Sequence, residues 1–276
     1  KCRKGHLIYF AGEPPMMRPL PNRFIAQFDE IFVPNIKSKH ERKHLSHGFL
    51  NWSLGVNFRT KEHKYTYEDI KNWKPQKNKI ISIVTSNKKM MPGHNKRMLF
   101  IKKLMSDFPG QIDFYGAGHN QVDFKADALL PYKFHICLEN SDIPYYWTEK
   151  FSDPLLAKCV PIYCGCTNLS EYFDENGYIS FSYDDYDSLR ARLIKIFADP
   201  ESEYESFRPY MEANRLKLME ELNLIPFVIK EFGTNESDII QQYTVSPLQC
   251  YREYWNMFKI IRAKRFLYRV YSHLFE

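Results

Sequence analysis

Residues 132–150 read Tyr-Lys-Phe-His-Ile-Cys-Leu-Glu-Asn-Ser-Asp-Ile-Pro-Tyr-Tyr-Trp-Thr-Glu-Lys, and this stretch decides the fold. The apolar residues 134–138 predict a short buried strand, which ends in the polar residues 139–141. A polar, aromatic loop follows, and Thr148 is a suitable N-cap for a helix that begins directly after it. Polar groups where a strand gives way to a helix are typical of ligand sites in open α/β sheets. The helix N-terminus and Lys150 together favour an anion, most simply a phosphate.

Strand and helix patterns alternate on both sides of this stretch. Apolar runs predict strands at 80–84, 112–115, 134–138, 160–163 and 178–181, and helical periodicity predicts helices at 95–108, 148–158 and 186–197. Pro154 predicts a kink or an early end in the second of these helices. Short strands separated by helices indicate a parallel α/β sheet.

The part of the chain before this sheet is smaller. Residues 6–10 predict a strand, residues 24–33 a short helix and a second strand, and residues 60–78 a linker or surface loop. We therefore predict an amino-terminal domain at 1–75, a sheet domain at 76–235 and a carboxy-terminal helical segment at 236–276. A length of 276 residues is sufficient for two modest domains, each with its own core.

The composition limits the class of protein. Hydrophobic residues make up 44% of the chain and aromatic residues 16%, which is typical of an ordered globular protein. No apolar run approaches the length that spans a membrane. The net charge of +6 suits a phosphate-rich ligand or an anionic membrane surface. Because Lys and Arg are scattered and no nucleic-acid module is recognisable, we expect no nucleic-acid partner.

Residues 254–271 form an amphipathic helical pattern near the end of the chain. Its basic face carries Lys259, Arg262, Arg265 and Arg269, and its apolar side carries Met257, Ile260, Ile261, Leu267, Tyr268 and Tyr271. One interpretation is an interfacial helix on anionic lipid, which would give the protein a peripheral membrane contact. The other is a terminal helix that packs its apolar side on the protein. Both interpretations require the same apolar stripe.

Two patterns have the residue types of a metal site, but their spacing and position argue against one. The cluster Cys159, Cys164 and Cys166 has no fourth Cys or His at zinc spacing, so zinc is disfavoured. Cys137 and Cys164 are expected to be small buried hydrophobes. The sequence Asp185-Tyr186-Asp187 matches the Asp-x-Asp motif of metal-dependent transferases, but it opens a predicted helix, where capping favours acidic residues. We therefore predict no metal ligands.

Residues 132–150 also resemble a known family signature. Tyr-Lys-Phe at 132–134, Leu-Glu-Asn-Ser at 138–141, Thr-Glu-Lys at 148–150 and Pro161-Ile162-Tyr163-Cys164-Gly165 stand in the order found in the α1,3-fucosyltransferase family. The chain is similar to its bacterial members. The resemblance implies an α/β fold of the GT-B type, with two Rossmann-like domains facing a cleft. It also implies GDP-fucose as the donor substrate, an acceptor glycan as partner and inversion at the fucose anomeric carbon.

The resemblance assigns roles to individual residues. Glu13, in Tyr-Phe-Ala-Gly-Glu at 9–13, matches the setting of the general base. Arg97 would grip the diphosphate and Lys150 would neutralise it, while Glu149 would accept hydrogen bonds from the ribose hydroxyls. Asn140, Tyr146 and Asn87 complete the expected donor site. Glu139 is expected to anchor the loop through backbone N–H groups, and Tyr132 and Phe134 to be core residues. With two cations at the diphosphate, a divalent metal is not expected to be essential.

The resemblance defines the acceptor and the cellular location less closely than the donor and the reaction. The expected acceptor is the 3-hydroxyl of N-acetylglucosamine or glucose. The expected location is the cytoplasm of a bacterium, at the inner face of its membrane, with surface glycans such as lipopolysaccharide as product. A Golgi lumenal fragment, with an anchor upstream of residue 1, is the alternative. The amino-terminal domain is also expected to be partial, because the family's first domain usually begins several dozen residues earlier. A transferase of the same fold with another nucleotide-sugar, and a non-catalytic glycan- or nucleotide-binding relative, are the rival functions.

Overall fold

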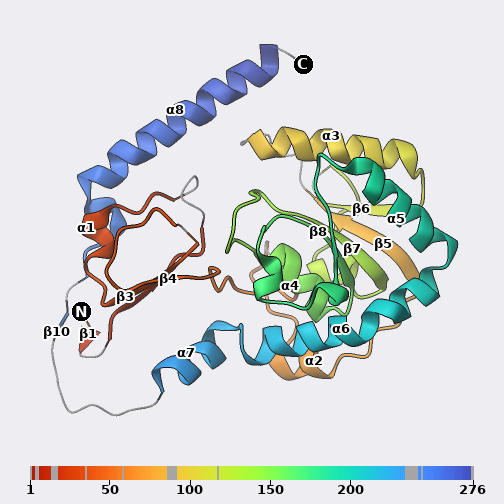
Figure 1. Cartoon of the computed structure of the whole chain (residues 1–276), viewed down its shortest axis with the longest axis horizontal. Helices are drawn as coiled ribbons and strands as arrows, with labels where there is room; N and C mark the ends of the chain where they lie inside the picture. Colours follow the sequence, from red (N-terminus) through yellow and green to blue (C-terminus); the bar gives the residue numbers. More distant parts are fainter. Residues whose placement is uncertain are drawn as a thin grey trace. The chain divides into compact units, whose positions relative to one another are not determined.

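The computed structural model describes residues 2–3, 6–13, 18–34, 36–57, 59–85, 92–116, 118–233, 242–243 and 245–274. The chain divides into two compact units, whose elements are labelled in Figure 1. Unit 1 comprises Lys1–Leu50, Ile143–Tyr146 and Leu222–Glu276, and unit 2 comprises Asn51–Asp142 and Trp147–Glu221. These limits differ from the boundaries at 75 and 235 that the sequence predicted.

Unit 2 is built on a five-stranded parallel sheet. Its strands are β5 (Lys79–Val84), β6 (Ile112–Tyr115), β7 (Tyr132–Leu138), β8 (Val160–Cys164) and β9 (Ile179–Ser180), in the order β6-β5-β7-β8-β9. Every residue of the central strand β7 is buried, as expected for a strand covered on both faces. The chain runs from β5 outward to β6 and then back past β5 to β7. Ligands bind at such a switch point, outside the carboxyl ends of the strands.

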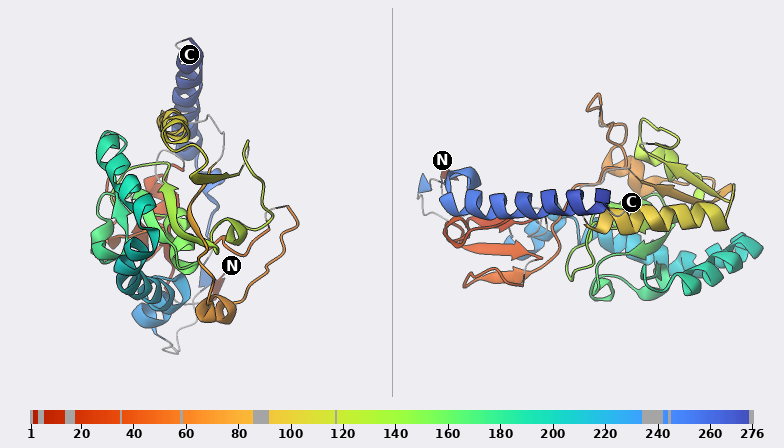
Figure 2. Two further views of the ribbon diagram at one scale, coloured as in Figure 1. Left: turned by 90° about the vertical axis from the view of Figure 1, so that its right-hand side faces the viewer. Right: turned by 90° about the horizontal axis from the view of Figure 1, so that it is seen from above.

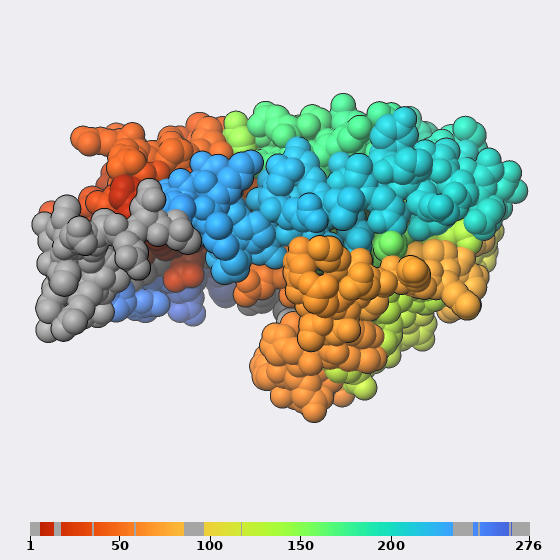
Figure 3. All heavy atoms as spheres, turned by 90° about the horizontal axis from the view of Figure 1, so that it is seen from below, coloured from red at the N-terminus to blue at the C-terminus, as the bar shows by residue number. Residues whose placement is uncertain are grey.

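Helices cover both faces of this sheet. They are α2 (Tyr67–Asn72), α3 (Pro92–Asp107), η1 (Lys125–Ala128), α4 (Glu149–Leu156), η2 (Leu169–Glu171), η3 (Glu175–Gly177), α5 (Tyr186–Ala198) and α6 (Pro200–Glu220). Figures 1 and 2 show α3 on one side of the sheet and α4 and α6 on the other. This follows from right-handed crossovers that leave the switch point in opposite directions. In Figure 3, α6 (cyan) lines one surface of unit 2 and the segment around α2 (orange) projects beside it.

Most predicted elements of unit 2 are confirmed. All five strands are present, and α3, α4 and α5 lie where helices were predicted. The helix α4 ends at Leu156, two residues after Pro154, as the proline indicated. Tyr132 and Phe134 are core residues, with 1% and 0% of their surface exposed. The prediction for residues 60–78 was wrong in one respect, because they contain α2, which starts at a capping box formed by Thr66 and Asp69.

Unit 1 contains a smaller parallel sheet. Its strands are β2 (Ile8–Phe10), β3 (Glu30–Val33) and β4 (Lys43–Leu45), in that order. The helices α1 (Asn22–Ile25), α7 (Leu224–Phe232) and α8 (Arg252–Leu274), the turn η4 (Leu248–Cys250) and the antiparallel pair β1 (Cys2–Arg3) and β10 (Gln242–Tyr243) complete it. Among the described helices, none is long and apolar enough to cross a membrane.

Alternating side chains give the small sheet two apolar faces. Tyr9 and Ile31 lie on one face, within a core that also contains Phe24 of α1. Phe32 lies on the other face, and its ring centroid is 5.3 Å from that of Phe227 in α7. This contact explains why α7 belongs to unit 1. A single short sheet has too little core by itself, and α7 supplies aromatic surface to bury.

Candidate functional site

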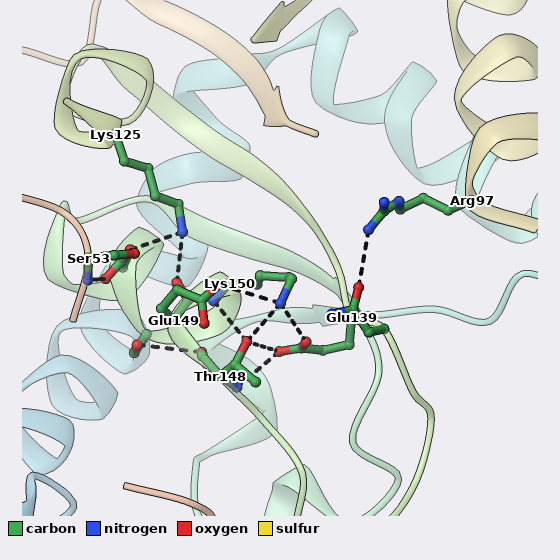
Figure 4. A network of polar contacts seen from close by, with 10 residues as sticks. Ser53, Arg97, Lys125, Glu139, Thr148, Glu149 and Lys150 are labelled. Atoms are coloured by element: carbon green, nitrogen blue, oxygen red, sulfur yellow. Dashed lines mark hydrogen bonds and ion pairs between the residues drawn. The ribbon is translucent and has the colours of Figure 1, made fainter. Parts of the chain in front are cut away.

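The carboxyl end of β7 meets the start of α4 through the side chain of Glu139, as Figure 4 shows. Its Oε1 atom accepts hydrogen bonds from the backbone N–H of Thr148 (2.9 Å) and from the Thr148 hydroxyl (2.6 Å). The Glu139 side chain has no exposed surface. The hypothesis that this carboxylate anchors the loop through backbone N–H groups is therefore confirmed. The strand and the helix are held together at the predicted anion site.

Lys150 lies in the first turn of α4, which Thr148 caps by accepting a hydrogen bond from the Lys150 backbone N–H (3.3 Å). The Lys150 Nζ atom is 3.1 Å from Glu139 Oε2 and 3.4 Å from Glu149 Oε1. Burial alone would lower the pKa of Lys150, but the two carboxylates outweigh it and hold the pKa above its ordinary value. The ammonium group is therefore charged at neutral pH and fixed in direction.

The Glu149 carboxylate is also ionised, and its side chain is 30% exposed. Burial would raise the pKa of Glu149, but Lys150 and Lys125 outweigh that effect and lower the pKa. An ionised, partly exposed carboxylate at a helix start has free oxygen lone pairs for hydroxyl donors. The geometry thus suits the acceptor role that was predicted for Glu149.

Lys125 forms a second polar network beneath α4, also visible in Figure 4. From η1, its Nζ atom donates to the Glu149 carbonyl oxygen (2.9 Å) and to Asp153 Oδ2 (2.9 Å). Asp153 is completely buried and accepts from the Ser53 backbone N–H (3.1 Å) and hydroxyl (2.7 Å). The sequence did not predict these three residues. The available signal was a carboxylate, Asp153, on the buried side of an apolar helix, where an ion must find a partner.

Arg97 approaches the same edge of the sheet from α3. Only 6% of its surface is exposed, and its Nη1 atom donates to Asn140 Oδ1 (3.3 Å). Burial is the main effect on the pKa of Arg97 and lowers it, whereas Tyr183 and Glu139 act in the opposite direction. A guanidinium keeps its charge in proteins even so. Two residues predicted for the donor site, on different elements, are thus in contact.

Gly165, directly after β8, accounts for the last element of the sequence signature. A Cβ atom at this position would lie 2.5 Å from Tyr163 Oη and 2.6 Å from Glu139 Cγ. Any larger residue would therefore displace the Glu139 side chain, which holds the start of α4. Gly165 therefore leaves the space that the Glu139 side chain occupies.

The remaining predicted residues belong to unit 1 or lie outside the described residues. Tyr146 is buried and belongs to unit 1. Glu13 is an exposed residue of unit 1, three residues after β2, and Asn87 lies outside the described residues. Asp185 caps α5 by accepting from the Ser188 backbone N–H (3.3 Å), which confirms the capping interpretation. In the described part of the chain, no group of His, Cys, Asp and Glu side chains is arranged to hold a metal ion.

A parallel sheet with cations at its switch point is typical of α/β units that bind anionic ligands. Residues 74–244 match the pattern of glycosyltransferase family 10 (fucosyltransferase), carboxy-terminal part. The match covers more than half of the chain, and the chain belongs to this family. The resemblance seen in residues 132–150 is thereby confirmed, and the parallel sheets confirm the predicted α/β class of fold.

The chain is similar to individual members as well. It is 32% identical over 105 residues to a putative fucosyltransferase-like protein of Arabidopsis thaliana, across 36% of this chain and 20% of the relative. It is 26% identical over 156 residues to α-(1,3)-fucosyltransferase B of Drosophila melanogaster, across 50% of this chain and 34% of the relative. The matched region thus spans about a third or less of these relatives.

Solved structures give further likenesses. The crystal structure of an α1,3-fucosyltransferase with GDP-fucose has a TM-score of 0.48 and 19% identity, over 92% of this chain and 74% of the other. The crystal structure of TarM has a TM-score of 0.46 and 10% identity, over 76% of this chain and 44% of the other.

Proposed function

We propose that this chain transfers L-fucose from GDP-fucose to a hydroxyl of an acceptor glycan, with inversion at the anomeric carbon. One observation carries the proposal. The buried Arg97 with its partner Asn140, and the Glu149–Lys150 pair, lie at the switch point of a parallel sheet, within residues 74–244 that match the fucosyltransferase family. One similar solved structure is that of an α1,3-fucosyltransferase with GDP-fucose, which supports the choice of donor.

The donor diphosphate is the natural ligand of the two cations. The Arg97 fork binds phosphate oxygens bidentately, and Lys150 neutralises the charge that develops as GDP departs. Glu139 and Thr148 fix the ammonium group of Lys150. No reorganisation free energy is therefore needed to orient this group during the reaction. Glu149 accepts from the ribose hydroxyls, while Asn140, Tyr146 and Asn87 position the nucleotide-sugar. With charge stabilised in this way, the chemistry requires no metal ion.

The acceptor side of the reaction depends on Glu13. Its carboxylate takes the proton from the acceptor hydroxyl, which attacks the sugar from the side opposite to GDP. The proposed acceptor is the 3-hydroxyl of N-acetylglucosamine or glucose. The exposure of Glu13 supports the assignment, because a general base must reach an incoming hydroxyl. Glu13 lies before the matched residues 74–244, so its role rests on the local Gly-Glu motif.

Turnover of GDP-fucose with a panel of galactose-bearing acceptors tests the proposal. The Glu13→Gln variant should lose turnover by about 100-fold or more with little change in the KM for GDP-fucose, the usual size of a general-base effect. Glu41→Gln, another exposed loop glutamate of unit 1, is the matched control and should keep parental activity. Equal activity of Glu13→Gln and the parent would disprove the assignment of Glu13 as the general base. GDP binding without turnover in the parent would favour a binding module, and loss of activity with a chelator would contradict the metal-free mechanism.

We also propose that α8 contacts an anionic membrane, which would place the enzyme at the inner face of a bacterial membrane. Met257 and Ile260 on its apolar side are 40% and 57% exposed, and Trp255 and Phe266 are exposed at 46% and 65%. Exposed apolar and basic residues on one helix are typical of interfacial helices. Sedimentation with phosphatidylglycerol vesicles should fall after Lys259→Glu with Arg262→Glu, but not after Lys39→Glu with Lys102→Glu. Equal sedimentation of both variants would contradict the contact.

A further inference from the structure

Tyr183 has a buried hydroxyl that no described residue binds. It lies in the loop between β9 and α5, at the carboxyl edge of the unit 2 sheet. Its Oη atom is shielded from solvent and has no hydrogen-bond partner among the described residues. Buried polar groups are normally paired, so an exception needs a physical reason. A ligand that supplies the missing acceptor is one such reason.

The ring of Tyr183 is held beside the Arg97 helix. Its centroid is 5.2 Å from that of Phe100, with the planes at 83°, and 6.3 Å from that of Phe181. Phe100 follows Arg97 by three residues on α3, so both side chains lie on the same side of that helix. The aromatic contacts thus fix the direction of the phenol next to the buried guanidinium.

Electrostatic effects agree with this placement. Burial raises the pKa of Tyr183 far above its ordinary value, Cys164 raises it further, and Arg97 opposes the rise. The phenol is therefore protonated at neutral pH and offers one O–H donor. The nearby Glu139 carboxylate is already occupied by Thr148 and Lys150. The acceptor for this donor must come from outside the described network.

A second hydroxyl at the same sheet edge is also buried and also has no hydrogen-bond partner among the described residues. Thr85 follows β5 at the switch point, is 8% exposed, and its Oγ1 atom likewise has no partner in the described part of the chain. Two hydroxyl donors and a buried guanidinium at one edge form a donor-rich surface. The ligand that satisfies such a surface is rich in anionic oxygen atoms, as a nucleoside diphosphate is.

We propose that the Tyr183 hydroxyl donates a hydrogen bond to a phosphate oxygen of the bound nucleoside diphosphate, beside the Arg97 guanidinium. Tyr183 is then a further donor-binding residue of unit 2. The inference rests on the proposed function, because it takes GDP-fucose as the ligand of this edge. It makes the loop after β9 part of the donor site, in addition to the loops after β5 and β7.

Calorimetric titration with GDP, together with thermal unfolding, tests the inference on the whole chain. Tyr183→Phe should weaken GDP binding by about tenfold or more, the usual effect of losing a hydrogen bond to a charged group. Without GDP its melting temperature should equal or exceed that of the parent, because the variant buries no unpaired hydroxyl. The matched control is Tyr186→Phe, since the Tyr186 hydroxyl already donates to Asp107 Oδ2 (2.9 Å). That control should melt at a lower temperature and bind GDP as the parent does.

Two results would overturn the inference while leaving the proposed function intact. One is GDP binding by Tyr183→Phe that equals parental binding. The other is a loss of stability as large as that of Tyr186→Phe, which would show that the hydroxyl is satisfied inside the protein. If the parent chain itself failed to bind GDP, the proposed function would fail, and the role of Tyr183 would fail with it.

Discussion

Lys150 shows how a single side chain serves both the fold and the proposed chemistry. Its ammonium group compensates the buried carboxylate of Glu139, which in turn holds the backbone of Thr148. The side chain of Lys150 is 24% exposed, so a ligand can still reach it. Removing the cation would leave the buried Glu139 carboxylate without the ammonium group that lies 3.1 Å away. A buried carboxylate in that situation is costly.

We therefore predict that Lys150→Met lowers the free energy of unfolding by roughly 3 kcal/mol, the range typical of breaking a buried pair. It should also weaken GDP binding. Lys158→Met is the matched control, because Lys158 Nζ pairs with Glu212 Oε1 (2.9 Å) where both side chains are partly exposed. That pair should contribute about 1 kcal/mol or less. Urea unfolding of the three proteins is the measurement, and equal destabilisation by the two substitutions would contradict the structural role of Lys150.

At the scale of elements, α4 is positioned by contacts of its buried side chain Asp153 as well as by contacts at its N-terminus. Asp153 links the helix to Ser53, which stands near the start of unit 2, and Lys125 links the same carboxylate to the Glu149 carbonyl. The register of the first turn, and so the direction of Glu149 and Lys150, depends on this buried network. A side chain that touches no substrate should therefore influence donor binding.

The prediction concerns Asp153→Asn, which keeps an acceptor for Ser53 but removes the charge next to Lys125. We expect a loss of roughly 2–3 kcal/mol in unfolding free energy, because the largely buried Lys125 would lose its partner. The KM for GDP-fucose should rise more than kcat falls. Asp127→Asn, from an exposed pair with Lys64 (3.8 Å), is the control and should change neither quantity. An unchanged KM in Asp153→Asn would mean that the network stabilises the fold without positioning the donor site.

The elements differ in how far the sequence predicted them. The strands β5, β7 and β8 were predictable because they are mostly apolar, as buried parallel strands are. The strand β6 was predictable because Ile112 and Phe114 alternate with more polar positions. The helix α2 was missed because its residues are mostly polar, although Thr66 and Asp69 carried a capping signal. The helix α6 was not predicted, since polar residues separate its few buried ones.

The contacts of the candidate site also differ in how far the sequence predicted them. Glu139, Thr148 and Lys150 lie within one short stretch of the sequence, so local order indicates their meeting. The contact between Ser53 and Asp153 joins positions 100 residues apart. The approach of Tyr183 to the Arg97 helix likewise depends on side-chain packing between α3 and the loop after β9. A single sequence contains no local pattern for such pairs, and only the fold brings them together.

At the scale of the whole molecule, each unit contains a buried neutral histidine. In unit 1, His47 is 2% exposed and accepts the Phe49 backbone N–H at Nδ1 (3.2 Å). Burial lowers the pKa of His47 to about 3. In unit 2, His135 is 2% exposed, its Nδ1 is 2.8 Å from the Ser82 hydroxyl, and burial is the largest cause that lowers its pKa well below the ordinary value. Both imidazoles must be uncharged for the native packing to persist.

The pH dependence of stability follows from these pKa values. Below the ordinary value of 6.5 the unfolded chain binds protons that the folded chain does not, so stability falls as the pH falls from 6.5 towards 3. The slope for one such histidine is at most about 1.4 kcal/mol per pH unit. His47→Asn, whose amide oxygen can accept the Phe49 N–H, should flatten the pH dependence of unfolding free energy over this range. The exposed His63→Asn should leave it unchanged, and a flat profile in the parent would contradict the assignment.

Unit 2 is proposed as the site of GDP-fucose, and calorimetric titration of the whole chain with GDP and with UDP tests this assignment. We predict that GDP binds at least about tenfold more tightly than UDP, equivalent to about 1.4 kcal/mol. We also predict that Arg97→Met reduces GDP binding. Equal or tighter binding of UDP, or binding of GDP that is unaffected by the loss of Arg97, would contradict the assignment.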